Sequence, residues 1–97
     1  MSTYISLINY TEQGIRKIKE SPKRLNVVKK LARKLGGELK EFYLTMGDID
    51  IVVIYNMPDD ATAAKFMLTV GSTGAIRSRT LTAFPEEQYR EIIGALP

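Results

Sequence analysis

Two strand-like segments joined by a Gly-Asp pair constrain the fold of this chain more than any other feature. Residues 38–46 and 49–55 are rich in β-branched and aromatic side chains, and Gly47 and Asp48 lie between them. Glycine adopts positive φ readily and aspartate can bond back to its own chain, so the pair predicts a β-hairpin. The second segment is nearly all apolar, which indicates a central strand that is covered on both faces.

The composition predicts one globular domain spanning residues 1–97. Hydrophobic residues make up 44% of the chain and charged residues 26%, as in ordinary folded proteins. The chain has no cysteine and no histidine, so we expect no disulfide, no thiol nucleophile, no histidine-based metal site and no Ser-His-Asp site. No cofactor is implied. Without a signal-peptide pattern or a long apolar run, a cytoplasmic protein with no membrane partner is expected.

The first half of the chain predicts a strand followed by a helix. The strand spans residues 3–9, and Ser21 and Pro22 begin the helix as its N-cap and first helical residue. Gly36 ends it, because glycine accepts the left-handed conformation that closes many helices. One face of this helix is apolar at three- and four-residue spacing, with Leu25, Val28, Leu31, Ala32 and Leu35.

A second helix, a fourth strand and a final helix are predicted after the hairpin. The second helix begins near Pro58, the strand spans residues 75–83, and the final helix begins near Pro85. The buried line of the second helix is expected to comprise Ala64, Met67, Leu68 and Gly71.

This order of elements is that of a ferredoxin-like α+β fold, βαββαβ, with an additional C-terminal helix. It predicts one antiparallel sheet with both long helices on one face and with the first and third strands at its centre. The third strand is apolar on both sides, so the helix-free face would expose apolar side chains. We therefore expect a homodimer or higher homo-oligomer in which two sheets pack into a dimeric α+β barrel.

Motifs along nearly the whole chain resemble the GYD family of small bacterial and archaeal proteins. In order, they are Thr11-x-x-Gly14, Ser21-Pro22-x-Arg24, Leu35-Gly36-Gly37, Thr45-Met46-Gly47-x-x-Asp50, Pro58-Asp59-Asp60 and Gly71-Ser72-x-Gly74, followed by a strand to Ala83-Phe84. The resemblance implies the dimeric α+β barrel fold and brings no generally assigned activity. Ile49 stands where the family usually has tyrosine, and Asn56 stands where an acid is expected.

Five residues are candidates for a ligand site over the sheet: Asp50, Tyr43, Arg77, Tyr4 and Ser6. Asp50 precedes an apolar run, so its carboxylate could act as a base, bind a cation, accept turn amides or pair with an arginine of the fourth strand. Arg77 and Arg79 share one sheet face, where they could hold an anion or form structural ion pairs. We expect the five side chains to converge on the helix-free face.

Positive charge is concentrated in one helical region. Residues 15–34 contain nine Lys or Arg and one acid, a local charge of +8, whereas the rest of the chain carries −5. We interpret the region as the solvated face of an amphipathic helix, with Lys23, Lys29, Lys30, Arg33 and Lys34. It contains no aromatic residue for base stacking and no Gly-rich phosphate loop, so no nucleic-acid partner is expected.

Two functional hypotheses follow from these features. The first is a small-molecule binding or accessory module, with a small anionic or phenolic ligand held between the sheet and the helices. The second is a cofactor-independent enzyme, monooxygenase- or isomerase-like, that depends on Asp50, tyrosines and arginines. The second hypothesis rests mainly on analogy with other dimeric α+β barrels.

Overall fold

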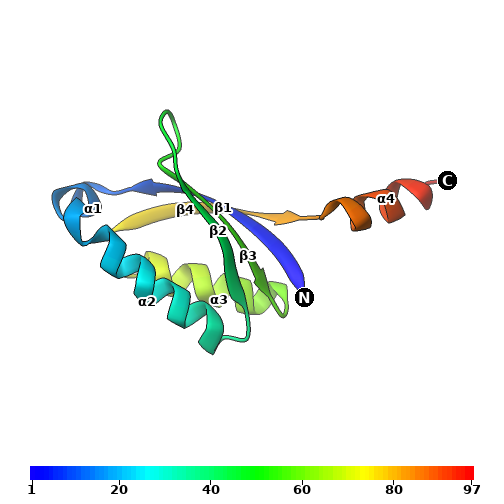
Figure 1. Ribbon diagram of the computed structural model, residues 1–97, viewed down its shortest axis with the longest axis horizontal. Coiled ribbons are helices and arrows are strands. Elements are labelled where there is room, and N and C mark those ends of the chain that lie inside the picture. Colours follow the sequence, from blue (N-terminus) through cyan, green and yellow to red (C-terminus); the bar gives the residue numbers. More distant parts are fainter.

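The computed structural model describes residues 1–97 and contains one antiparallel sheet with two long helices on a single face (Figure 1). The elements are β1 (Ser2–Tyr10), α1 (Glu12–Arg16), the short 3-10 helix η1 (Ile18–Glu20), α2 (Ser21–Lys34), β2 (Glu38–Leu44), β3 (Ile51–Met57), α3 (Asp60–Gly71), β4 (Ile76–Ala83) and α4 (Glu86–Gly94). The strand order is β2-β3-β1-β4, so the predicted ferredoxin-like fold and its central pair of strands are confirmed.

The predicted hairpin is present, but its connection is longer than a two-residue turn. β2 ends at Leu44 and β3 begins at Ile51, so residues 45–50 form the loop. The Thr45 N–H donates to the carbonyl of Asp50 at 2.8 Å, and the Thr45 hydroxyl donates to the carbonyl of Ile49. These bonds place Ile49 and Asp50 in the loop rather than in the strand.

The two faces of the sheet differ because side chains alternate along each strand. In β1, Tyr4, Ser6 and Ile8 are buried beneath the helices, whereas the residues between them point to the helix-free face. β3 follows the same alternation, and its outward-facing Val52 and Ile54 are only half-buried. The prediction that β3 is apolar on both sides is therefore confirmed.

The core lies between the sheet and the helices, with aromatic rings at its centre. Tyr55 is fully buried, stacks on Tyr4 at a centroid distance of 5.6 Å, and meets Phe66 edge-on at 5.1 Å. Pairs of this kind add about 0.5–1.5 kcal/mol beyond the area they bury.

The buried stripe of α3 differs from the predicted one. Its members are Ala63, Phe66, Met67 and Val70. The expectation for Ala64 and Leu68 was wrong: both are exposed, Leu68 by 73%, while Gly71 is half-buried. The buried positions keep helical spacing but begin one residue earlier, which turns Leu68 toward solvent.

The turn between β1 and α2 packs closely against the start of β4. Thr11 is the N-cap of α1, and its hydroxyl accepts the N–H of Gly14 at 3.1 Å. The Thr11 N–H in turn donates to the carbonyl of Ala75 at 3.0 Å. A Cβ atom at Gly14 would lie 2.1 Å from that carbonyl oxygen, so this close approach requires glycine.

Helix α4 lies apart from the rest of the chain. Figure 1 shows it beyond the end of β4, where it covers neither face of the sheet. None of its residues is buried, and Tyr89, Ile92 and Ile93 are 53%, 44% and 51% exposed. No helix in the chain combines the length and apolar character needed to cross a bilayer.

Candidate functional site

The five predicted ligand-binding residues lie in different parts of the fold. Tyr4 and Ser6 face the helices, whereas the register of β2 and β4 turns Tyr43 and Arg77 toward the helix-free face. Their expected convergence over one face was therefore wrong, because the alternation of β1 directs Tyr4 and Ser6 to the other side. Whether any of them contacts a ligand stays a prediction.

Asp50 lies at the loop end of the central strand pair. Its Oδ2 accepts the backbone N–H of Tyr10 at 2.9 Å and the side-chain amide of Asn9 at 3.4 Å. Its own N–H donates to the carbonyl of Ile8 at 3.0 Å. Asp50 is therefore an acceptor of amides, but these amides come from the end of β1 and not from its own turn as predicted. No ion pair joins Asp50 to an arginine of β4.

Ser6 belongs to a small polar cluster on the helix-covered side of the sheet. The fully buried Ser6 hydroxyl lies 2.9 Å from the hydroxyls of both Tyr55 and Thr80, and 3.3 Å from the sulfur of Met67. These contacts satisfy its hydrogen-bonding capacity, as burial of a hydroxyl requires.

The Tyr4 hydroxyl donates to Asp60 Oδ1 at 2.5 Å. Burial raises the pKa of the Tyr4 phenol, and the hydrogen bond to Asp60 raises that pKa further. Because its pKa is raised, the Tyr4 phenol stays neutral and donates a hydrogen bond at ordinary pH. A shallow depression of about 290 Å³ lies beside Tyr4 and Asp60, and Thr80 and Thr82 form part of its wall.

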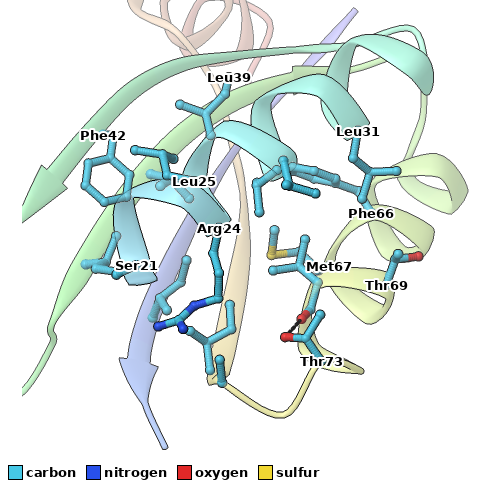
Figure 2. Close-up of a pocket in the computed structure, with 18 of the residues that line it drawn as sticks. Ser21, Arg24, Leu25, Leu31, Leu39, Phe42, Phe66, Met67, Thr69 and Thr73 are labelled. Carbon is cyan, nitrogen blue, oxygen red and sulfur yellow. Dashed lines mark hydrogen bonds between the residues drawn. The ribbon is translucent and has the colours of Figure 1, made fainter. Parts of the chain in front are cut away.

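A more enclosed pocket of about 240 Å³ lies between α2, α3 and the sheet (Figure 2). Fifteen of its nineteen lining residues are hydrophobic. α2 contributes Val28 and Leu31, α3 contributes Phe66 and Met67, and Phe42 lines it from β2. Concave, mainly apolar spaces with a few polar groups are the usual form of small-ligand sites.

Arg24 is the single charged residue in the lining of this pocket. Its Nη1 donates to the carbonyl of Lys17 at 3.2 Å, while its buried Nη2 has no hydrogen-bond partner. Arg24 was not predicted as a site residue, because it was counted with the surface charges of the basic region. The available signal was its spacing: Arg24 precedes Val28 by four residues and Leu31 by seven, so it lies on the apolar stripe of α2.

The other basic residues of α2 form a separate outer surface, called here the basic face. Its members are Lys23, Lys29, Lys30, Arg33 and Lys34. All five are exposed, so their interpretation as a solvated helix face is confirmed. The ion pairs of the chain are Arg16 with Glu12, Lys40 with Glu38 and Arg90 with Glu86, and none involves the basic face.

A four-stranded antiparallel sheet with paired helices on one side defines a ferredoxin-like α+β domain. Within that class, the chain belongs to the GYD domain family, whose model matches residues 4–93. The family assignment drawn from the motifs is thereby confirmed.

The chain is also similar to a named relative from Thermus thermophilus. That protein is called glutamine synthetase and cystathionine beta-lyase binding protein, and it is 33% identical over 86 residues. The matched region covers 88% of this chain and 90% of the relative.

Solved structures support the fold at lower sequence identity. A feast or famine regulatory protein from M. tuberculosis, complexed with L-methionine, matches 88% of this chain with a TM-score of 0.67 and 12% identity. The chain spans about half of that protein, 51% of its length. A structure of FFRP-DM1 matches 87% of this chain and 100% of its own, with a TM-score of 0.60 and 20% identity.

Proposed function

We propose that this protein is an accessory module that binds a metabolic enzyme through the basic face of α2. The observation that carries the proposal is a set of five exposed cationic side chains on one helix, none of them paired with an acid of the same chain. Like charges held together in this way repel each other and favour an acidic partner surface.

The relative from Thermus thermophilus supplies the first enzymes to test. Its name describes binding to glutamine synthetase and cystathionine beta-lyase, and its match to this chain is nearly full-length. We therefore propose that one of these two enzymes, from the same organism as this chain, is the partner. Binding would place an acidic patch of the enzyme against α2.

A second copy of the chain is part of the same proposal. Val52 and Ile54 on the helix-free face are half-buried, Leu81 is 50% exposed, and the apolar side of α4 has no cover. Pairing the two helix-free faces would bury the side chains of β3 and β4, as the dimeric α+β barrel requires. Because α2 lies on the opposite side of each sheet, such a dimer would present two basic faces outward.

A direct binding experiment tests the enzyme partnership. Purified chain is titrated into purified glutamine synthetase or cystathionine beta-lyase, and the heat of binding is measured at two salt concentrations. Saturable binding to one enzyme, weakened by salt, is the expected result, because exposed charges are screened as ionic strength rises. Lack of binding to both enzymes would contradict the proposal.

Nucleic acid must be included in that experiment, because the basic face would also attract phosphates. The expectation of no nucleic-acid partner stays a prediction. Duplex and single-stranded DNA should fail to displace the enzyme at near-physiological salt. Displacement by DNA would reassign the basic face to nucleic-acid binding.

Small-molecule binding is the second candidate function, and the apolar pocket around Arg24 favours it. The two roles are compatible, since the pocket and the basic face lie on different sides of α2. The cofactor-independent enzyme and the cytoplasmic location both stay predictions.

A further inference from the structure

We propose that the pocket between α2, α3 and the sheet binds a monocarboxylate with an apolar tail, and that Arg24 holds its carboxylate. The inference rests on the small-molecule role named above and is independent of the enzyme partnership. It assigns a ligand class and an anchoring residue to a pocket whose lining includes none of the five predicted site residues.

Arg24 carries a charge that no acid of the chain pairs. Its Nη2 is buried and unpartnered, and its Nη1 reaches only the carbonyl of Lys17, at 3.2 Å. Buried charged groups in proteins are normally paired, because an unpaired one loses its hydration without replacement. The lining contains no aspartate or glutamate that could serve as the counterion. An anion from outside the chain would supply both the missing hydrogen-bond partner of Nη2 and a counterion for the guanidinium.

The pocket around Arg24 is small and mainly apolar. Figure 2 shows Arg24 extending from α2 into the space between Ser21 and Met67, with Phe66 and Leu31 at the far side. The volume of about 240 Å³ lies below the usual range for drug-sized ligands, roughly 300–1,000 Å³, so a small molecule is favoured. A carboxylate at the guanidinium and an apolar tail among the hydrophobic side chains would satisfy both ends of the site.

Because no acid lines the pocket, it should distinguish simple carboxylates from zwitterionic amino acids. A free amino acid carries an ammonium beside its carboxylate, and that ammonium would meet Arg24 without a counterion of its own. Like charges placed together disfavour binding, so zwitterions should be rejected. The favoured ligands are simple carboxylates with either an alkyl or an aryl tail.

Four related compounds test this recognition directly. 3-Phenylpropanoate carries the proposed groups, 3-phenylpropanol removes the charge, phenylalanine adds an ammonium, and octanoate replaces the aryl tail by an alkyl one. Binding is followed by NMR of protein labelled at the methionine methyl groups, because Met67 lines the pocket and the fully exposed Met46 does not.

The expected result is a saturable shift of the Met67 signal with 3-phenylpropanoate, while the Met46 signal is unchanged. A similar shift with octanoate would show that the pocket also accepts an alkyl tail. 3-Phenylpropanol should bind at least about tenfold more weakly than 3-phenylpropanoate because it loses a charged hydrogen bond. Phenylalanine should also bind at least about tenfold more weakly, because its ammonium meets Arg24 without a counterion. The ratio between the two acids identifies the tail. Equal binding of alcohol and acid would overturn the anchoring role of Arg24 yet leave a small-molecule role. If no compound binds at millimolar concentration, both the anchoring role of Arg24 and the small-molecule role of the pocket would be contradicted.

A matched pair of variants tests whether Arg24 holds the carboxylate of the ligand. Arg24→Met keeps the length of the side chain without its charge, and Lys23→Met makes the same charge change one residue away on the exposed side. Arg24→Met should lose the preference for acid over alcohol, whereas Lys23→Met should keep it. Retention of the preference in Arg24→Met would overturn the proposal.

The stability of the ligand-free variants gives an independent readout. Arg24→Met loses the Nη1 bond to the Lys17 carbonyl but also removes the buried, unpartnered Nη2, so the melting temperature should change little or rise. A clear fall in the melting temperature of Arg24→Met relative to Lys23→Met would mean that Arg24 is satisfied within the chain. That result would contradict the need for an external anion.

Discussion

The carboxylate of Asp50 accepts the backbone N–H of Tyr10 at 2.9 Å. The contact joins the loop before β3 to the end of β1, and Asn9 reinforces it by donating to the carbonyl of Asp48 at 2.7 Å. The side chain of Asp50 thus extends the pairing of β1 and β3 by one hydrogen bond beyond the end of the strands. This position gives Asp50 a structural role that can be measured.

Asp50→Ala should lower the free energy of unfolding by about 1–2 kcal/mol, because it removes a hydrogen bond between a carboxylate and a backbone N–H. Urea denaturation followed by circular dichroism measures the change. Asp48→Ala is the matched control in the same loop, where the side chain is exposed, and it should stay within about 0.5 kcal/mol of wild type. Equal losses in the two variants would contradict the role of Asp50.

Gly14→Ala should destabilise the protein by about 1–3 kcal/mol, because the new Cβ would overlap the backbone carbonyl of Ala75. Gly71→Ala is the control, since no atom lies within 4 Å of a Cβ at that helical position. Alanine there should be neutral or stabilising by up to about 1 kcal/mol. Thermal unfolding of both variants measures whether the melting temperature falls for Gly14→Ala and stays the same or rises for Gly71→Ala.

Stability should fall as the pH rises above about 10, because the pKa of Tyr4 is raised in the folded protein from its ordinary value of 10.0. Below pH 10 both states keep the phenolic proton, and the contribution of the raised pKa is fully present. Above it the unfolded chain releases the proton first, so stability is lost until the folded pKa is passed. In Tyr4→Phe, the free energy of unfolding, measured by urea titration, should fall less steeply with pH between about pH 9 and 11. An unchanged slope would contradict the burial of the phenol.

The helix-free face should hold two copies together at micromolar concentration. Analytical ultracentrifugation is expected to give twice the chain mass of 10.9 kDa. Val52→Glu should shift the protein to monomers, because it places a charge among apolar side chains of β3. Val27→Glu makes the same change on α2, where Val27 is 66% exposed, and should leave the dimer intact. A stable wild-type monomer would contradict this assembly.

Much of the fold could be predicted because its signals are local. The glycines after α2, the proline before α3 and the apolar run of β3 mark the ends and types of elements without reference to the rest of the chain. The position of the buried stripe of α3 could not be fixed in this way. Ala64 and Leu68 satisfy helical spacing as well as Ala63 and Met67 do, and only packing against the sheet selects between them.

The candidate site was less predictable, because it depends on which way side chains point. Tyr4 and Tyr43 have similar sequence settings, but strand alternation and register place them on opposite faces of the sheet. Arg24 was hidden within a run of surface lysines, and only the path of α2 over the sheet turns it into the pocket. Charge counting identified the basic face correctly, since a charged helix face exposed to solvent needs no tertiary information.

Two charge-matched double variants decide whether the basic face of α2 binds an enzyme. Lys29→Glu with Lys30→Glu reverses charge on the basic face, whereas Lys40→Glu with Lys65→Glu makes the same change in net charge on β2 and α3. The dissociation constants of both variants for glutamine synthetase and cystathionine beta-lyase are measured by calorimetry beside wild type. We expect at least about tenfold weaker enzyme binding for the α2 variant and a change of less than about threefold for the other. Equal weakening in both variants, or unchanged binding by the α2 variant, would contradict enzyme binding through the basic face.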